Sequence, residues 1–210
     1  MNNRQAYNTW ARNYDAVINK TRDLEAFALR ETLSRIELSR AKVLEIGCGT
    51  GKNTIWLSTR AQHIVGVDFA EEMLHEAKKK IITKNVEFYQ FDIKEKWVFS
   101  EEQFDLVICS LILEHIENID FVFKQANLVL KRNGLFYVGE LHPFKQYQGS
   151  KARFDTDKGV FELNCFVHNI SDFFEAGKNN NFECIDIKEW FDNDDKTTIP
   201  RLLMMLFRKK

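Results

Sequence analysis

Short apolar runs recur along the first two thirds of the chain, and segments with helical periodicity separate them. The five clearest runs occupy residues 42–46, 63–67, 86–91, 104–110 and 135–140. Such runs are typical of parallel strands that other elements cover on both faces. Their alternation with helical segments predicts an α/β fold, built on a doubly wound and mostly parallel sheet.

Helices are predicted between these strands from apolar residues that recur at helical spacing. In one of them, Met73 and Ala77 would share a face. Another precedes Gly134, which is expected to end it because glycine commonly follows the last helical turn. Further along the chain, Ser171 is expected to cap a short helix that runs to Gly177.

The C-terminal part of the chain predicts strands of two kinds. Ile185 and Ile187 alternate with polar residues, as in a strand with one exposed face. Residues 202–207 are continuously apolar, which predicts a strand inserted between two neighbours. The segment 142–170 is long for a connection within a compact domain, and segments of this length usually carry function.

Composition limits the size, the partners and the compartment of the protein. With 210 residues, the chain is expected to form a single domain over residues 1–210. Its net charge of −1 predicts no general attraction to nucleic acid or to anionic membranes. No apolar run is long enough to span a bilayer, and residues 1–10 lack an apolar signal core. We therefore expect a cytoplasmic protein, whose oligomeric state the sequence leaves open.

The four cysteines indicate reduced thiols. Cys48, Cys109, Cys165 and Cys184 form no C-x-x-C pair, and three of them lie in apolar runs. Buried free thiols are expected in that setting, with neither a disulfide nor a metal site. Reduced thiols also fit a cytoplasmic protein.

The first predicted strand leads directly into Gly47, Gly49 and Gly51, and then into a helix from about Lys52. Glycine suits a position where the backbone turns sharply and a ligand approaches closely. In an open α/β sheet, this first turn lies beside the ligand-binding crevice. Two common nucleotide signatures do not fit. Lys52 stands where the dinucleotide fingerprint requires its third glycine, and Asn53 stands where the phosphate loop requires Ser or Thr.

Asp68 ends the second predicted strand, 19 residues after Gly49. A carboxylate at this place can accept hydrogen bonds from both hydroxyls of a ribose. Together with the glycine loop, Asp68 therefore predicts a site for a ligand that contains a ribose.

These features resemble the class I S-adenosylmethionine (SAM)-dependent methyltransferases, in the small-molecule branch that includes ubiquinone and menaquinone methylases. Five segments resemble successive motifs of that family: residues 43–51, 66–74, 90–93, 104–116 and 130–136. The resemblance covers roughly residues 7–140 well and the remainder loosely. It implies a Rossmann-like sheet of seven strands with an antiparallel C-terminal strand.

The resemblance also implies that SAM is the cofactor, with S-adenosylhomocysteine (SAH) as the product. The residues implied are Glu45, Gly47, Cys48, Gly49 and Ser110 for the methionine end, Asp68 for the ribose, Phe69 and Met73 for packing on the adenine, and Asp92 and Ile93 for hydrogen bonds to the adenine. No metal is implied.

Residues 1–40 are expected to cover the site as a helical lid. Tyr7, Trp10 and Tyr14 fall on one helical face, and Tyr14 with Asp15 matches a pair often found in the covering helix of this family. A lid that closes over cofactor and acceptor excludes water. The same aromatic face also suits a helix that simply packs on the sheet, and the sequence leaves both interpretations open.

The segment 142–170 is expected to form much of the acceptor pocket, because it leaves the fifth strand at the rim where the methyl group of SAM should point. Arg153 would bind an anionic or strongly polar group of the acceptor. Alternatively, Arg153 pairs with Asp155 or Asp157 on the surface. His142 would orient the acceptor or take its proton.

His115 is the third candidate for acceptor chemistry. It lies in a Leu-Glu-His-Ile string common to this branch, where it would either contact the substrate or serve a structural purpose. The predicted reaction transfers the methyl group of SAM to a small-molecule acceptor by in-line displacement, in which the protein aligns the reactants and excludes water. The alternatives are a methyltransferase acting on tRNA, a protein or a peptide, and a SAM-binding protein without transferase activity.

Overall fold

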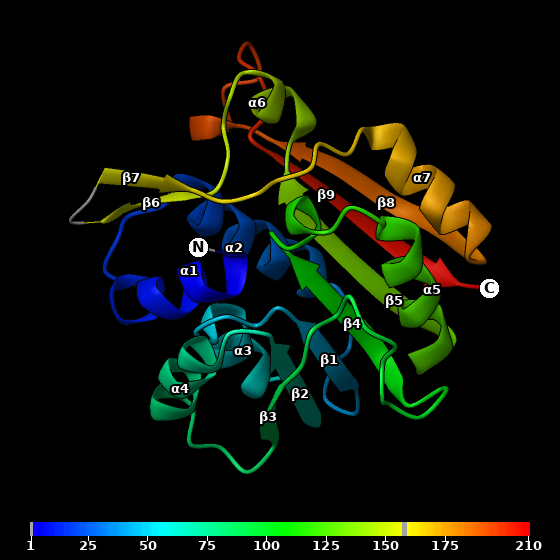
Figure 1. Cartoon of the computed structure of the whole chain (residues 1–210). Helices are drawn as coiled ribbons and strands as arrows, with labels where there is room; N and C mark the ends of the chain where they lie inside the picture. Colours follow the sequence, from blue (N-terminus) through cyan, green and yellow to red (C-terminus); the bar gives the residue numbers. More distant parts are fainter. Residues whose placement is uncertain (1, 157–158) are drawn as a thin grey trace.

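The computed structural model has one seven-stranded sheet in the order β3-β2-β1-β4-β5-β9-β8 (Figure 1). The structure describes residues 2–156 and 159–210. The strands are β1 (Lys42–Ile46), β2 (His63–Asp68), β3 (Val86–Gln90), β4 (Phe104–Ser110), β5 (Leu130–Leu141), β8 (Phe182–Trp190) and β9 (Leu202–Lys209). The first five are parallel, and β9 runs antiparallel to both of its neighbours. The predicted doubly wound sheet with an antiparallel C-terminal strand is therefore confirmed.

Helices cover both faces of this sheet (Figure 1). On one face pack α2 (Lys20–Leu33) and α3 (Lys52–Ser58). On the other pack α5 (Ile119–Val129) and α7 (Ile170–Asn179). A further helix, α4 (Glu71–Lys80), lies against β2 and β3. Within residues 2–156 and 159–210, no helix is both long enough and apolar enough to cross a membrane.

The alternation of side chains along each strand produces two hydrophobic cores, one on each side of the sheet. In β1, Val43 faces the core under α2 and α3, whereas Leu44 faces the core under α5 and α7. Both residues are fully buried. Because both faces are buried, these strands must be apolar throughout, which is why they stand out in the sequence.

The strand order reverses between β1 and β4, which pair with each other although two strands lie between them along the chain. In open α/β sheets, ligands bind outside the carboxyl ends of the strands at such a point. The fold therefore places the glycine loop after β1 beside the residues that follow β4.

Two segments far apart in the sequence lie together over this edge of the sheet (Figure 1). One contains α1 (Asn3–Trp10) and the short helix η1 (Ala11–Asn13). The other contains α6 (Pro143–Tyr147) and the hairpin of β6 (Arg153–Thr156) and β7 (Gly159–Glu162), so the segment expected as a long connection has secondary structure of its own.

Apolar packing and paired amides join these two segments. Ala6 and Trp10 of α1 form a small buried cluster with Leu163. Asn3 and Asn164 exchange hydrogen bonds, because the side chain of Asn3 donates to the Asn164 carbonyl at 3.1 Å and accepts from the Asn164 N–H at 3.2 Å. We call residues 3–33, which contain α1, η1 and α2, and residues 159–169 the cover.

Two predicted helix boundaries are wrong. The helix before Gly134 ends at Val129, and Gly134 lies within β5, where a Cβ atom would approach the Lys131 carbonyl oxygen to 2.8 Å. The helix near Ser171 is capped by Asn169, whose side chain and that of Asp172 bond reciprocally to the first turn. The predicted strand at 202–207 is confirmed as β9, between β5 and the more exposed edge strand β8.

Candidate functional site

A cavity opens at the carboxyl edge of the sheet, at the point where the strand order reverses. It encloses about 990 Å³ with its open mouth included. Loops that follow β1, β2, β3 and β4 supply one wall. The cover supplies the other wall through Asn3, Tyr7, Tyr14, Arg22 and Glu25.

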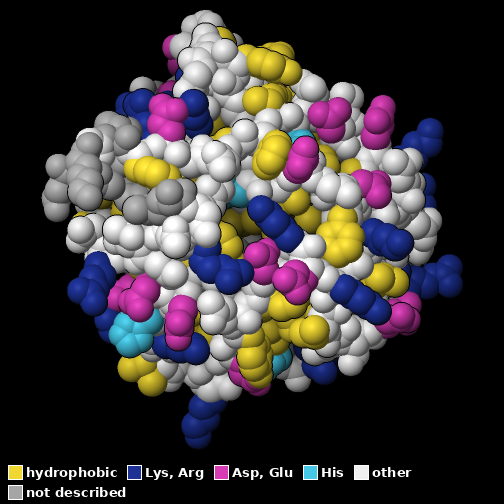
Figure 2. Space-filling model, in the orientation of Figure 1, with side chains coloured by type: hydrophobic (Ala, Val, Ile, Leu, Met, Phe, Trp, Pro, Cys, Tyr) yellow, Lys and Arg dark blue, Asp and Glu magenta, His cyan; other side chains and the backbone are white. Residues whose placement is uncertain are grey.

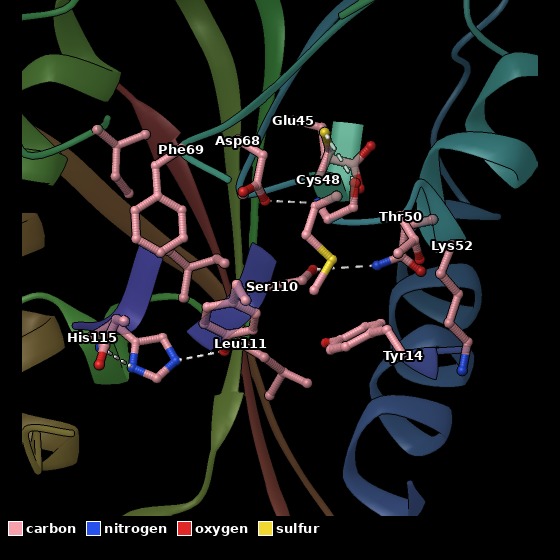
Figure 3. A pocket seen from close by; sticks show the side chains of 18 of the residues that line it. Tyr14, Glu45, Cys48, Thr50, Lys52, Asp68, Phe69, Ser110, Leu111 and His115 are labelled. Carbon is pink, nitrogen blue, oxygen red and sulfur yellow. Dashed lines mark hydrogen bonds between the residues drawn. The ribbon is translucent and has the colours of Figure 1, made fainter. Parts of the chain in front are cut away.

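The ten residues predicted to contact a cofactor all line this cavity. They are Glu45, Gly47, Cys48, Gly49, Asp68, Phe69, Met73, Asp92, Ile93 and Ser110. Figure 3 shows Phe69 and His115 at one end, Tyr14 and Lys52 at the other, and Asp68 between them. We refer to these as the Phe69 end and the Lys52 end.

The glycine loop forms the floor of the cavity with a backbone that side chains would distort. Gly47, Gly49 and Gly51 have φ angles of +67°, +53° and +81°, in the left-handed region that favours glycine. At Gly47 a Cβ atom would lie 2.2 Å from Cδ1 of Ile112. The loop therefore brings bare backbone to the cavity and allows Ile112 to approach it closely.

Asp68 lies at the centre of the cavity and is almost fully buried. One carboxylate oxygen accepts the Gly49 N–H at 2.9 Å, and the other accepts the Ala70 N–H at 2.8 Å. Burial raises the pKa of Asp68 to about 6, against the opposing effect of these hydrogen bonds. Each oxygen keeps a second acceptor position, so the carboxylate can still receive two ligand hydroxyls.

Apolar side chains and one carboxylate form the Phe69 end. Met73 and Ile93 are buried here, and Phe69 is partly exposed beside the ring of Tyr7. Asp92 accepts the Lys94 N–H at 3.1 Å and pairs with Arg4 at 3.2 Å. The arrangement suits a flat ring that bears an amino group.

The Lys52 end contains buried carboxylates. Burial raises the pKa of Glu45 to about 8, and its Oε2 accepts from the Thr54 hydroxyl at 2.5 Å. Burial also raises the pKa of Glu25, which accepts from Ser110 at 2.6 Å and from Asn53 at 2.9 Å. Acidic groups held in this way favour a ligand that carries positive charge.

Sequence reasoning missed Arg22 and Glu25, both of which line the cavity. A signal was present in the helical pattern of α2. Glu25, Leu29 and Leu33 are spaced by four, and all three are buried. Charged residues on an otherwise apolar helical stripe need partners, and such positions often belong to a functional site.

His115 is held between the two parts of the cover. Its Nδ1 lies 3.1 Å from the Asn164 carbonyl, and its Nε2 lies 2.8 Å from the Tyr7 hydroxyl. Burial lowers the pKa of His115, so the neutral ring prevails. The Asn164 carbonyl only accepts and is nearer to Nδ1 than the Asn3 amide nitrogen at 3.3 Å, so we assign the proton to Nδ1, and Nε2 then accepts from Tyr7.

The loop after β4 is fixed by buried hydrogen bonds. Leu111 has a φ of +57°, and its N–H donates to the Gly139 carbonyl at 2.8 Å. Glu140 accepts the N–H groups of Ile112 and Leu113, each at 2.9 Å. Non-glycine residues in this conformation persist where the surroundings hold them, which is common at functional sites.

The structure places His142 outside the cavity, in contrast to its predicted contact with the acceptor. Its side chain is fully buried; one ring nitrogen accepts the Phe144 N–H at 3.2 Å and the other lies 3.0 Å from Glu189. The fold uses His142 to begin α6, and these two bonds occupy both ring nitrogens.

Arg153 also lies away from the cavity lining, on the exposed side of the hairpin. Its charge contributes to lowering the pKa of Glu162 on the paired strand, after the larger effect of Lys151. The predicted alternative of a pair with Asp157 lies outside the described residues. No described residue of the segment 142–170 lines the cavity, so the prediction that this segment forms much of the acceptor pocket is not supported.

All four thiols are free. Cys48 and Cys109 are buried, and Cys165 and Cys184 are half-buried. Among the described residues, no group of three potential metal ligands gathers in one place.

Residues 44–138 match a family described as "Methyltransferase domain". The chain is 31% identical over 160 residues to a malonyl-[acyl-carrier protein] O-methyltransferase of Bacillus anthracis, in an alignment that covers 73% of this chain and 58% of that protein. It is 26% identical over 105 residues to a ubiquinone biosynthesis O-methyltransferase of Pelagibacter ubique, which covers 50% of this chain and 44% of that protein. The alignments thus span about half the length of these relatives.

Solved structures share the fold. The DhpI–SAH complex superposes with a TM-score of 0.77 at 23% identity, over 98% of this chain and 94% of that chain. A SAM-dependent methyltransferase from Mesorhizobium loti gives a TM-score of 0.74 at 19% identity, over 87% of this chain and 96% of that chain. These likenesses show that the sheet, its order and its covering helices follow a known methyltransferase architecture.

Proposed function

We propose that this chain, which belongs to the class I SAM-dependent methyltransferases, binds SAM in the cavity and transfers its methyl group to a small organic acceptor. The observation that carries the proposal is the meeting of the glycine loop with Asp68 where the strand order reverses. There, bare backbone and a carboxylate with free acceptor positions meet in one deep cavity.

The cavity fits SAM along its length. The adenine would lie at the Phe69 end, between Phe69 and Met73, with its amino group toward Asp92. The ribose hydroxyls would donate to Asp68. The methionine end would then reach the Lys52 end, where Ser110 and the buried carboxylate of Glu45 lie.

SAM supplies an activated methyl group bound to a sulfonium, so the protein has to align the acceptor with that methyl and keep water away. Tyr7 lines the cavity, and its ring stacks on that of Trp10 with the centroids 6.1 Å apart. Asp15 joins the cover to the glycine loop, because it accepts from the Thr50 hydroxyl at 2.8 Å. These contacts hold the reacting groups in a space shielded from solvent.

Tyr7 and His115 are the best-placed groups to take a proton from an acceptor that must lose one. With the proton on Nδ1, Nε2 of His115 can act as a base. The Tyr7 hydroxyl would lie between Nε2 and the acceptor. The hydroxyl would take the acceptor proton and pass its own to His115. The Glu114 carboxylate, 4.0 Å from Nε2, would stabilise the imidazolium that results.

The enclosed cavity and the near-neutral net charge favour a small acceptor over tRNA. Two relatives are named for malonyl-[acyl-carrier protein] and for ubiquinone biosynthesis, so malonyl-[acyl-carrier protein] and precursors of ubiquinone are the first acceptors to test. With His142 and Arg153 outside the cavity lining, neither residue is proposed to bind the acceptor.

The test has two stages. Calorimetry of the full chain with SAH, NAD and ATP should give binding of SAH alone; binding of NAD or ATP without SAH would refute the proposal.

A screen of small metabolites with methyl-labelled SAM should then yield a labelled product. In that assay Tyr7→Phe and His115→Asn should lower kcat while leaving the affinity for SAH unchanged. SAH binding without any labelled product, across metabolites, tRNA and peptides, would leave a SAM-binding protein without transferase activity.

A further inference from the structure

The strand β8 forms one edge of the sheet, three places beyond β4 in the strand order and away from the cavity (Figure 1). It has nine residues, whereas β3 at the opposite edge has five. Every second residue of an edge strand presents its N–H and C=O outward, where another strand can pair with them. β8 is therefore the longer of two sites at which the sheet could be extended.

The second half of β8 is exposed on both faces of the sheet. Residues 186–189 are exposed one after another, whereas buried and exposed residues alternate in a strand with one covered face. Their partners on β9 belong alternately to the two hydrophobic cores, so these side chains point to both faces. Ile187 is 43% exposed, although its alternation with polar residues suggests a covered face. The edge therefore has an exposed apolar residue at its centre.

Charges of opposite sign lie on either side of Ile187. Residues 186–190 pair regularly with β9, beyond the irregularity between Cys184 and Asp186. If two copies of this segment pair antiparallel about Ile187, the two-fold axis places Ile187 opposite itself and Asp186 of each copy opposite Lys188 of the other. Lys188 holds its ammonium 3.7 Å from the centre of the Trp190 ring, which keeps the charge at this edge. One apolar pair and two pairs of opposite charge would then join the copies.

The same charges exclude the neighbouring registers. Centring the pair on Asp186 would place two carboxylates directly opposite each other, and centring it on Lys188 would do the same for two ammonium groups. Like charges in that position destabilise a strand pair. Charged residues at a sheet edge generally prevent pairing, but here their order prevents the shifted registers and favours one.

We propose that β8 is a self-association surface, at which two copies of this chain join their sheets by antiparallel pairing about Ile187. A second copy is the occupant because the charge pattern of the edge is complementary to itself. The proposal goes beyond methyl transfer, since the cavity beside β1 and β4 stays open in such a dimer. A single strand carries the contact, so the dimer should be reversible, with a dissociation constant of about 10 µM to 1 mM.

Sedimentation equilibrium of the full chain between about 5 µM and 1 mM should show a reversible equilibrium of monomer and dimer. Asp186→Lys and Lys188→Asp should each raise the dissociation constant at least about tenfold, because symmetry turns both charge pairs into like-charge pairs. The double variant exchanges the two charges and should return to within about threefold of the parent protein. A parent protein that stays monomeric would overturn the proposal. A double variant as weak as the single variants would overturn the register.

Glu87→Lys is the matched control, because it makes the same change of charge at an exposed position of the opposite edge strand, β3. Its replacement should leave the dissociation constant within about twofold of the parent protein. If Glu87→Lys weakens the dimer as much as Asp186→Lys, net charge governs association and β8 is not the contact. Calorimetry with SAH should give the parent affinity for both β8 variants, so a failure of the cofactor proposal is recorded separately from a failure of the dimer.

Discussion

The two walls of the cavity are built on different physical principles. One wall is the strand edge, which consists of the loops that follow β1, β2, β3 and β4. It supplies backbone in conformations that only glycine adopts readily, and the buried carboxylate of Asp68 accepts a hydrogen bond from the same loop. The cover supplies side chains, among them Tyr7, Arg22 and Glu25, from helices that are not part of the sheet. The edge is fixed by the sheet beneath it, whereas the cover depends on the contacts it makes.

The contacts between cover and edge are both apolar and polar. Ala11 packs in a buried cluster with Ala70 and Met73, and the polar contacts around it are partly exposed. Asp15 bonds to Thr50 and pairs with Lys80, and Arg4 pairs with Asp92. Hydrogen bonds from Lys80 and Thr50 lower the pKa of Asp15, although its partial burial opposes this shift. Individual pairs of this kind contribute little to stability. Because α2 is anchored in the core beneath it, the comparison predicts that α1 and η1 are the part of the cover able to open for exchange.

The largest effect is expected at the edge, from Gly47→Ala. The left-handed φ costs a side chain about 1–2 kcal/mol, and the approach of Ile112 adds about 1–3 kcal/mol of overpacking. Chemical denaturation should therefore show a loss of about 2–5 kcal/mol in the free energy of unfolding. Gly149→Ala is the control, because Gly149 has a φ of +87° and no atom within 4 Å of the Cβ position. Equal losses in the two variants would mean that close packing at the edge adds nothing.

The next effect concerns the edge carboxylate. Asp68→Asn replaces an acceptor of ribose hydroxyls and of two backbone N–H groups, so SAH affinity should fall by about 1.5–3 kcal/mol, the scale of hydrogen bonds to a charged group. Because Asp68 is buried and accepts the N–H groups of Gly49 and Ala70, its replacement should also lower the free energy of unfolding. Calorimetry and denaturation of the same samples measure both effects. Unchanged SAH affinity would show that Asp68 does not bind the ribose.

Lowering the pH should weaken the binding of the ribose through Asp68. The folded-state pKa of Asp68 is raised to about 6, and ligand hydroxyls bind its ionised form. The affinity for a ligand that contains the ribose should reach its full value well above pH 6. It should fall as the pH drops below 6, by about tenfold near pH 5. Methylthioadenosine is the proper probe, because it reaches the ribose site without an amino-acid end for Glu25 and Glu45 to contact. A flat affinity between pH 5 and pH 7 would contradict ionisation of Asp68 in this range.

A smaller effect should separate the cover from the edge. Tyr7→Phe removes the hydroxyl that donates to His115. The loss of this hydrogen bond should lower the stability of the cover by about 1 kcal/mol. Hydrogen exchange should show faster exchange for the amides of α1 and no change in β1 and β4. If the strands exchange faster by the same factor, cover and edge open as one unit and the distinction between them is wrong.

The smallest effect is expected from Arg4→Gln, which breaks an ion pair between the cover and the edge. The Arg4 side chain is 48% exposed and that of Asp92 is 26% exposed. Solvent screening limits the contribution of such a pair to the free energy of unfolding to about 0.5 kcal/mol or less. Replacing Lys151 in its exposed pair with Glu162 gives a control of similar exposure far from the cavity. A larger loss of SAH affinity for Arg4→Gln than for Lys151→Gln would assign Arg4 a direct part in binding the adenine.

The sequence by itself determined the sheet and the strand edge. Strands buried on both faces must be apolar throughout, and a tight turn at a ligand must contain glycine, so both leave a local pattern. The ten residues predicted for the cofactor accordingly line one cavity. Helix ends were less secure: α5 stops at Val129 although Gly134 suggested a later end, because an extended Leu130 begins β5 there.

Only the tertiary structure decided how the cover meets the edge. Arg22 and Glu25 face the cavity because α2 packs against β5 and β9, a contact between segments more than a hundred residues apart in the chain. His142, which follows the fifth strand as a site residue would, turns away because Glu189 and the start of α6 bind both of its nitrogens. The type of a residue at the end of a strand indicates which chemistry it could perform. The direction in which its side chain points depends on partners from distant segments, which no local pattern records.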